Sequence, residues 1–212
     1  MKRPKPGKDR LSDEPQASNP VEADAMSNPE DASQWQAEDV ISRGYLHDPE
    51  FIKRVENTAR VDDIDVDAFD ALVVAGGQGP MFTFDTATNL HVKFVEFYEA
   101  GKVTAALCHG VAILKFAHLL SGEPLVTGKT VSGFANVEED FADESMWEAG
   151  LLPTGTHVMP WRIEDERKAL GANYVQAGLW KGFAVRDGNL ITGQQNFSGA
   201  ETAALIIEAL GR

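Results

Sequence analysis

Two short apolar runs, each followed at once by a turn, constrain the fold of this 212-residue chain more than any other feature. Residues 70–75 end at Gly76-Gly77, and residues 103–107 end at Cys108. Runs that are short and apolar throughout are typical of strands buried on both faces of a parallel sheet. Between them, four apolar residues recur at helical spacing: Leu90, Phe94, Phe97 and Tyr98. The pattern therefore predicts a strand–helix–strand unit.

The alternation continues towards the C-terminus. Residues 129–134 and 174–176 are further strand candidates, and residues 163–170 form a short helical pattern closed by Gly171. The segment after Cys108 also has helical spacing, with four apolar residues expected on one face: Ile113, Phe116, Ala117 and Leu120. We therefore expect the α/β class, with a flavodoxin-like parallel sheet flanked by helices.

A hairpin and a helix are expected to complete the domain. Residues 183–192 form two strand-like runs around an Asp-Gly turn. Ser198 and Glu201 have the spacing of a capping box, which predicts a helix start at Ser198. Its inner stripe is expected to consist of Ala200, Ala203, Ala204 and Ile207.

The N-terminal segment has a different composition from the rest. Residues 1–33 are polar and interrupted by prolines, so we expect a loop-like or disordered segment. Residues 34–57 have a helical pattern broken near Asp48-Pro49. We expect residues 34–212 to form a single domain.

Charge and composition exclude several classes of protein. The formal net charge of −14 disfavours binding to nucleic acid or anionic lipid. No apolar run reaches the roughly 18 to 20 residues of a membrane span, and none follows the basic start as in a secretory signal. The single cysteine excludes an intrachain disulfide and a cysteine-based zinc cage, which favours a reducing, cytoplasmic setting and no metal.

Cys108 is the strongest candidate for chemistry. It lies where a buried strand meets a helix, among the small residues Ala105, Ala106 and Gly110, as in a nucleophile elbow. A helix N-terminus stabilises negative charge and so favours the reactive thiolate. A buried, inert cysteine is the alternative for an isolated Cys, and the elbow pattern argues against it.

Two neighbouring features can serve such a nucleophile. The glycine-rich turn Gly76-Gly77-Gln78 ends the preceding strand, where backbone N–H groups can approach a substrate oxygen. It lacks the spacing of a dinucleotide fingerprint, so we expect no nucleotide cofactor. His109 can act as a base if a carboxylate orients it. Three candidates follow the expected strand at 129–134 and remain open at this point: Glu138, Glu139 and Asp140.

Four segments in this order resemble the ThiJ/PfpI superfamily, which has the class I glutamine amidotransferase-like fold. They are residues 75–81, 106–110, 128–134 and 190–196. The branch that they resemble most is that of the glutathione-independent glyoxalases (glyoxalase III) and heat-shock chaperones.

The resemblance implies roles for individual residues. Cys108 is the implied nucleophile, His109 its base and Glu139 the acid of the triad. The backbone of Gly77 and His109 is implied to form the oxyanion site, beside Gly76 and Gln78. Phe82 and Trp180 are implied to line the pocket.

Two departures from the superfamily pattern affect the expected activity. Gln78 stands where related chains usually have histidine. Related chains also begin with a strand, a loop whose glutamate hydrogen-bonds the nucleophile, a helix and a second strand. No glutamate among the first forty residues follows an apolar strand, so we expect this segment to be missing and activity to be impaired.

The implied function is that of a lyase that converts 2-oxoaldehydes such as methylglyoxal into 2-hydroxy acids without glutathione or a cofactor. A related deglycase reaction would share its first intermediate. A stress-response holdase or thiol oxidation sensor is an alternative, and a cysteine peptidase or amidase is another. Related chains are often dimers, so we expect a homodimer.

Overall fold

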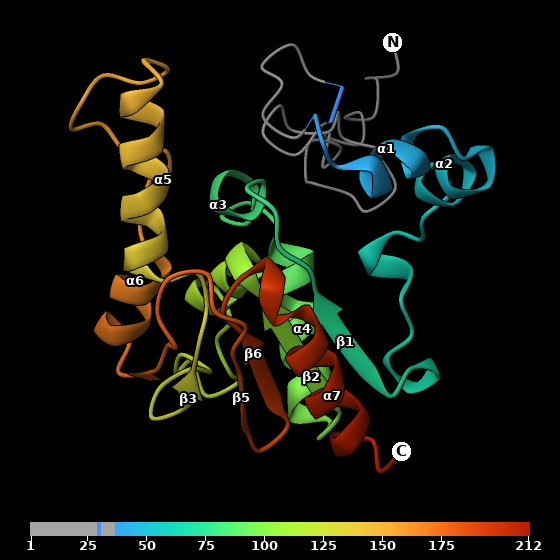
Figure 1. The fold of residues 1–212 in the computed structure, drawn as a ribbon. Coiled ribbons are helices and arrows are strands. Elements are labelled where there is room, and N and C mark those ends of the chain that lie inside the picture. Colours follow the sequence, from blue (N-terminus) through green and yellow to red (C-terminus); the bar gives the residue numbers. More distant parts are fainter. Residues whose placement is uncertain (1–28, 31–36) are drawn as a thin grey trace, which may run out of the picture.

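Four strands form the central sheet of the computed structural model, which describes residues 29–30 and 37–212 (Figure 1). Their order is β1 (Ala71–Val74), β2 (Val103–Leu107), β6 (Leu190–Gly193) and β5 (Ala184–Asp187). β1, β2 and β6 run parallel, whereas β5 pairs antiparallel with β6. This arrangement confirms the α/β class and the C-terminal hairpin.

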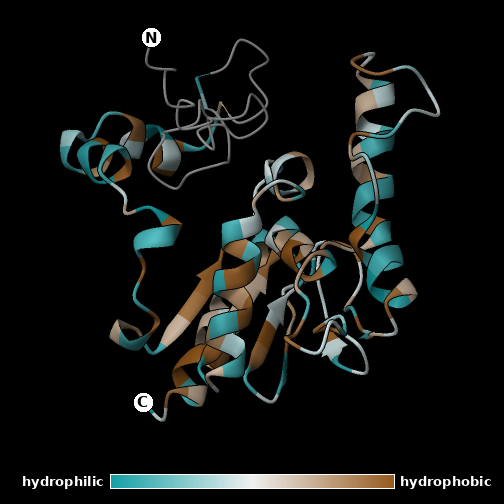
Figure 2. Ribbon diagram, turned by 180° about the vertical axis from the view of Figure 1, so that it is seen from behind, coloured by the Kyte–Doolittle hydropathy of each residue, from teal (hydrophilic) through white to brown (hydrophobic). Residues whose placement is uncertain are grey.

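Helices cover both faces of this sheet. Successive side chains of a strand point to opposite faces, and β2 shows this directly. Val103 and Ala105 pack beneath α7 (Gly199–Ala209), whereas Ala106 belongs to the larger core that includes residues of α4 (Thr88–Glu99). Figure 2 shows the apolar colouring of the strands between these layers. β2 is buried over most of its length because both of its faces are covered.

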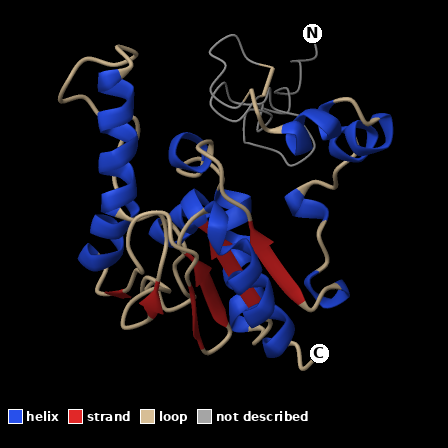
Figure 3. Cartoon of the chain, viewed as in Figure 1, coloured by secondary structure: helices blue, strands red, loops and turns tan. Residues whose placement is uncertain are grey.

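The remaining elements surround this core (Figure 3). In chain order they are α1 (Val40–Leu46), α2 (Pro49–Glu56), η1 (Val61–Asp63), η2 (Val66–Ala68), α3 (Pro80–Thr83), η3 (Cys108–Lys115), β3 (Thr130–Val131), α5 (Asn136–Glu148), α6 (Ile163–Ala169), β4 (Asn173–Tyr174) and η4 (Asn196–Ser198). β3 and β4 form a separate parallel pair. In Figure 1, α5 lies at one side of the sheet and α1 with α2 at the other.

The N-terminal predictions are only partly covered by the structure. The segment at 1–33 that we expect to be loop-like lies outside the described residues except for 29–30. The expectation that the front of the fold is missing also concerns residues outside the described range. The predicted break at Asp48-Pro49 is confirmed, because α1 ends before it and α2 begins at Pro49. The Asp48 carboxylate accepts hydrogen bonds from the backbone N–H groups of Glu50 and Phe51, which caps α2.

The helix predicted after β2 is shorter and tighter than expected. It is the 3₁₀ helix η3, which ends at Lys115. Beyond it the chain folds back on itself, since the N–H of Leu125 donates to the carbonyl of Ala117. Ala117 is buried as expected, but Leu120 lies at the tip of this turn with its side chain 92% exposed. Its predicted place on the inner face was wrong.

The strand predicted at 129–134 is reduced to the two residues of β3. The N–H of Thr130 donates to the Asp187 carboxylate at 2.8 Å, and the N–H of Ser132 donates to Thr192 Oγ1 at 2.8 Å. Side chains of the β5–β6 hairpin therefore replace the backbone ladder that would have joined this segment to the central sheet. The strand predicted at 174–176 is likewise β4, one residue earlier and two residues long.

The predicted inner face of the last helix was also wrong. α7 buries Thr202 and packs Leu205, Ile206 and Ala209 against the sheet, while the predicted stripe faces solvent. The expected capping box does not form. The hydroxyl of Ser198 instead accepts hydrogen bonds from the N–H groups of Phe183 and Gln195.

Within the part of the chain that the structure describes, we find no helix with the length and apolar character required to cross a membrane.

Candidate active site

Cys108 occupies the sharp turn between β2 and η3. Its φ of +57° is positive, which is uncommon for a residue with a side chain. Two glycines leave room for this turn. A Cβ on Gly110 would lie 2.7 Å from the carbonyl oxygen of Val74, and one on Gly76 would lie 2.6 Å from the Cβ of Cys108. The small residues around the nucleophile thus have a steric cause, as the elbow pattern predicted.

His109 connects the thiol to a carboxylate. Its Nδ1 lies 3.7 Å from Cys108 Sγ, and its Nε2 lies 3.0 Å from Glu139 Oε1. His109 is 4% exposed and Glu139 2% exposed, whereas the thiol is only partly buried. The three side chains therefore form a connected series that ends in the most accessible group, the thiol.

The surroundings of His109 favour its protonated form. Burial disfavours the charge, but the hydrogen bonds and charges of Cys108 and Glu139 outweigh it and raise the pKa of His109 to about 9. Phe134 stacks on the imidazole, with ring centroids 4.1 Å apart and an interplanar angle of 21°. At neutral pH both ring nitrogens therefore carry protons, one directed at Cys108 and the other at Glu139.

A cavity of about 740 Å³ opens over the thiol. Its lining comes from the glycine-rich turn, the elbow, α5, η4 and three loops. The lining residues are Gly77, Gln78, Cys108, His109, Phe134, Glu139, Phe141, Ala142, Ser145, Val158, Met159, Trp180, Asn196 and Phe197. Among them Glu139 carries the only carboxylate, and His109 already occupies it.

The structure brings most of the residues implied by the resemblance to one place. Gly77, Gln78 and Trp180 line the cavity with the triad. Gly76 lies beneath the thiol instead of in the cavity wall. Phe82 is not among the residues that line the cavity. It belongs to the short helix α3, whose buried residue is Met81, and its own ring is 57% exposed.

The structure also separates the three acidic candidates. Glu139 contacts His109, whereas Asp140 pairs with Arg162 at 2.7 Å on the surface. Glu138 is fully buried behind the cavity, where it accepts a hydrogen bond from the N–H of Ala135. Burial raises the pKa of Glu138, and the hydrogen bonds that it accepts oppose this rise. Glu139 is thus the only one of the three placed to orient the imidazole.

Several residues that line the cavity were not predicted from the sequence. The helical spacing from Glu139 could have identified two of them. Glu139, Ala142 and Ser145 follow one another at intervals of three along α5, so they share a helix face. Phe141, Val158, Met159, Asn196 and Phe197 reach the cavity only through the tertiary fold.

No group of three or more His, Cys, Asp or Glu side chains that could hold a metal ion occurs within residues 29–30 and 37–212. The chemistry that the site offers is that of a thiol nucleophile, an acid–base imidazole and an apolar cavity.

Known proteins are similar to this chain in fold and in sequence. "Probable glutathione-independent glyoxalase hsp3104" of Schizosaccharomyces pombe is 32% identical over 162 residues, which cover 76% of this chain and 70% of that protein. The crystal structure of glyoxalase III from Candida albicans has a TM-score of 0.64 and 29% identity, covering 79% of this chain and 69% of that one. Rapid Encystment Protein 24 KDa of Francisella tularensis has a TM-score of 0.71 and 29% identity, covering 85% and 75%.

The chain spans between 61 and 70% of the length of the curated relatives that it matches. The model of the DJ-1/PfpI family matches residues 50–209, a range that holds β1, the elbow and all three residues of the triad. Because this match takes in well over half of the sequence, the chain belongs to the DJ-1/PfpI family.

Proposed function

We propose that this protein is a cysteine-dependent, glutathione-independent glyoxalase that converts 2-oxoaldehydes such as methylglyoxal into 2-hydroxy acids. The observation that carries the proposal is the Cys108–His109–Glu139 series at the floor of the cavity. Two similar proteins, a probable glutathione-independent glyoxalase and glyoxalase III, are named for the same reaction.

The site provides the groups that this reaction needs. The Cys108 thiolate attacks the aldehyde carbon, and the protonated His109 gives its Nδ1 proton to the resulting alkoxide to form a hemithioacetal. Neutral His109 then removes the hydrogen on that carbon, and the proton returns to the adjacent carbonyl carbon through an enediol. The product is a thioester of the 2-hydroxy acid. Water hydrolyses it and restores the thiol.

The proposal also specifies how the oxyanion is stabilised and how fast the enzyme turns over. The backbone N–H groups of Gly77 and His109 are the proposed donors to the developing oxyanion. The described lining holds no second carboxylate besides Glu139, so His109 carries out both proton transfers. We therefore expect slower turnover than in relatives with a glutamate opposite the thiol.

One assay tests the proposal directly. Purified protein is incubated with methylglyoxal without glutathione, and substrate loss and lactate are followed for the wild type, Cys108→Ala and Cys108→Ser. We expect lactate to form in a one-to-one ratio with the methylglyoxal consumed by the wild type, and neither variant to form any. The proposed glyoxalase activity would be contradicted if folded wild-type protein formed no lactate, or if the variants formed as much lactate as the wild type.

A holdase is the second candidate, because α1 exposes apolar surface. Val40 and Ile41 on this helix are each 72% exposed. Suppression of the aggregation of a heated client protein that survives Cys108→Ala would favour this role. Loss of suppression on Cys108→Ala, or after oxidation of the thiol, would favour a redox sensor instead.

The proposed setting is the cytoplasm, and the proposed assembly is a homodimer. The free thiol of Cys108 suits a reducing compartment. The edge strand β1 exposes Val73, and a second copy could cover that edge. Light scattering coupled to size exclusion tests the assembly, and a monomer at all concentrations would contradict it.

A further inference from the structure

Backbone strain marks two residues of the candidate site. Among the non-glycine residues described, only Cys108 and Trp180 have a positive φ, with values of +57° and +53°. Both line the cavity. Such conformations cost free energy and persist only where the surroundings hold them, and they concentrate at functional sites. The strain at Cys108 is explained by the elbow, but nothing in the triad explains that at Trp180.

Two fully buried polar side chains hold the loop that carries Trp180. The N–H of Trp180 donates to Glu138 Oε1 at 3.2 Å. Gln194 Nε2 donates to the same oxygen at 2.8 Å and to the carbonyl of Gly178 at 2.8 Å. Gln194 Oε1 accepts from the N–H of Ala177 at 2.8 Å. Glu138 and Gln194 are both 0% exposed, and the bond between them is buried.

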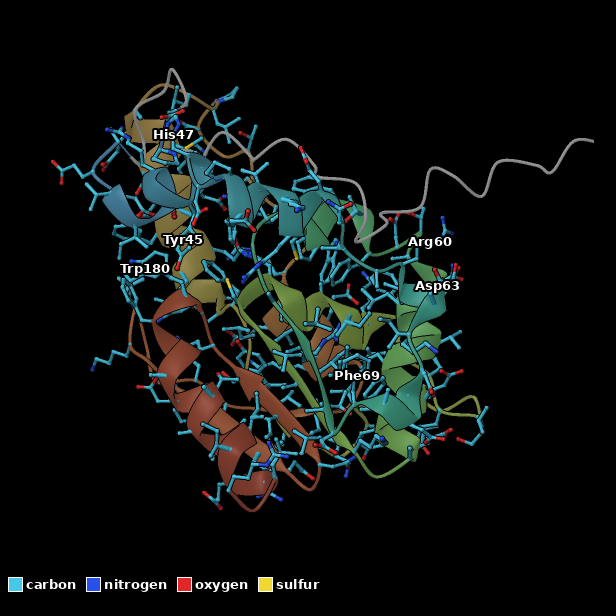
Figure 4. The ribbon with its side chains drawn as sticks, turned by 90° about the vertical axis from the view of Figure 1, so that its right-hand side faces the viewer. Tyr45, His47, Arg60, Asp63, Phe69 and Trp180 are labelled. Carbon is cyan, nitrogen blue, oxygen red and sulfur yellow. The ribbon has the colours of Figure 1, made fainter. Side chains whose placement is uncertain are left out.

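The indole of Trp180 continues the aromatic series that begins at the imidazole. It meets Phe134 at 5.9 Å and 70°, and Phe141 at 5.7 Å and 90°. Phe134 in turn stacks on His109. Figure 4 shows Trp180 beyond the N-terminal end of α7, at the margin of the fold. The loop therefore places a large apolar ring in the wall next to the reacting groups.

Glu138 itself has no direct access to the reaction. It does not line the cavity, and its second oxygen accepts the N–H of Ala135 at 3.0 Å. Its carboxylate thus accepts hydrogen bonds from the backbone N–H groups of Ala135 and Trp180 and from the side chain of Gln194. Any effect that it has on a substrate must pass through the loop.

We propose that Glu138 and Gln194 are positioning residues, which hold Trp180 in its strained conformation so that the indole contacts the substituent on the substrate's ketone carbon. The proposal rests on the proposed glyoxalase function for its substrate. The cavity of about 740 Å³ is far larger than a three-carbon oxoaldehyde requires, and its wall around Trp180 is aromatic. A flat, apolar substituent such as a phenyl group should therefore bind most tightly through this contact.

Glu138→Gln tests the proposal, with Glu164→Gln as the matched control. Glu164 is also a buried carboxylate, 8% exposed, and accepts the N–H of Asn136 at the start of α5, but it has no hydrogen bond to the Trp180 loop. The measurements are KM and kcat for phenylglyoxal and methylglyoxal, and the alkylation rate of Cys108 by iodoacetamide. The Trp180 resonance in 5-fluorotryptophan-labelled protein is also recorded, assigned with Trp180→Phe.

We expect Glu138→Gln to raise KM for phenylglyoxal about threefold to tenfold, the range that an aromatic contact accounts for. KM for methylglyoxal should rise less, and kcat and the alkylation rate should change by less than about twofold, since the triad is untouched. The Trp180 resonance should shift or broaden. Glu164→Gln should change none of these.

Other outcomes would overturn the proposal. If Glu138→Gln and Glu164→Gln behave alike, Glu138 has no special connection to Trp180. If kcat and alkylation fall while KM is unchanged, Glu138 acts through Glu139 and His109 instead. If Glu138→Gln fails to fold, Gln194→Met removes the bonds of Gln194 to Glu138, Gly178 and Ala177 from the same network, and is judged by the same criteria.

A failure of the proposed function gives a distinct result. If the wild type turns over neither aldehyde, the glyoxalase assignment fails while the Trp180 resonance still reports on the loop. The dissociation constant of acetophenone, an unreactive aryl ketone, then replaces KM and is read from that resonance. An unchanged resonance and dissociation constant in Glu138→Gln would overturn the positioning role independently of catalysis.

Discussion

At the scale of the residue, the chemistry depends on how three groups hold the imidazole of His109. Cys108 and Glu139 each interact with one ring nitrogen, and Phe134 covers one face. The pKa of His109 rises from its ordinary value of 6.5 to about 9, against the effect of burial, because both nitrogen partners favour the charged ring. The proton that the first step requires is therefore available at neutral pH.

Replacing Glu139 with glutamine tests this account. The variant keeps the shape but removes the negative charge, so the pKa of His109 should fall. The alkaline limb of the kcat/KM profile should move to lower pH. Asp140→Asn is the control, since Asp140 pairs with Arg162 on the surface. An alkaline limb that stays in place in Glu139→Gln would show that another group sets it.

The same shift links pH to stability. A histidine with a raised pKa in the folded state stabilises that state fully below the unfolded value of 6.5, and this contribution is lost as pH rises through about 9. The free energy of unfolding should therefore fall across this window in the wild type, and less in Glu139→Gln. Urea denaturation at several pH values measures the difference.

Gly76 gives a third prediction at this scale. A Cβ at this position would lie 2.6 Å from Cys108 Cβ and 3.1 Å from Sγ, so Gly76→Ala must displace the thiol. A displacement of this size should slow turnover roughly 10- to 100-fold. Gly79→Ala is the control, because a Cβ at Gly79 meets nothing within 4 Å. Equal rates for Gly76→Ala and the wild type would show that the elbow has spare room.

At the scale of the element, side chains of the hairpin replace a strand–strand ladder. Thr192 Oγ1 accepts the N–H of Ser132, and both residues are buried. Thr192→Val keeps the shape but leaves that N–H without a partner, which should lower the free energy of unfolding by about 1–3 kcal/mol. Thr192→Ser retains the hydroxyl and should lose less. A Thr192→Val variant as stable as Thr192→Ser would contradict this use of the hydroxyl.

Elements that are determined by neighbouring residues in the chain were predicted from the sequence, whereas elements that depend on tertiary contacts were not. β1, β2 and the β5–β6 hairpin follow from short apolar runs and their turns, and the structure contains them. The inner face of α7 could not be predicted from its alanines, because the helix packs Leu205, Ile206 and Ala209 against Val103, Ala105 and Ile191 instead. Those contacts exist only after the sheet has formed.

The candidate site shows the same division. The elbow at Cys108 and the adjacent His109 were visible in the sequence, because strand, turn and helix are contiguous there. The bond from His109 to Glu139 joins residues 30 positions apart, so the sequence alone left three acids open. The proposed positioning role of Glu138 could not be predicted from the sequence, because its partners Trp180 and Gln194 come together only in the folded chain.

At the scale of the whole molecule, one buried cation lowers the stability of the fold. Arg167 on α6 is fully buried, and none of its three guanidinium nitrogens has a hydrogen-bond partner among the described residues. Burial lowers the pKa of Arg167 to about 10, against the charge of Glu166. A buried charge without a hydrogen-bonded partner disfavours folding, so the apolar core must offset this cost.

Arg167→Met should therefore stabilise the protein. Methionine fills much of the same volume without a charge, and replacing a poorly compensated buried ion in this way gains about 1–4 kcal/mol. Arg162→Met is the matched contrast. Arg162 binds the buried carboxylate of Asp143 at 2.9 Å, so its removal should destabilise the fold. Urea denaturation decides between the two. If Arg167→Met lowers the free energy of unfolding as Arg162→Met does, the guanidinium of Arg167 binds a partner in solution and its burial does not disfavour folding.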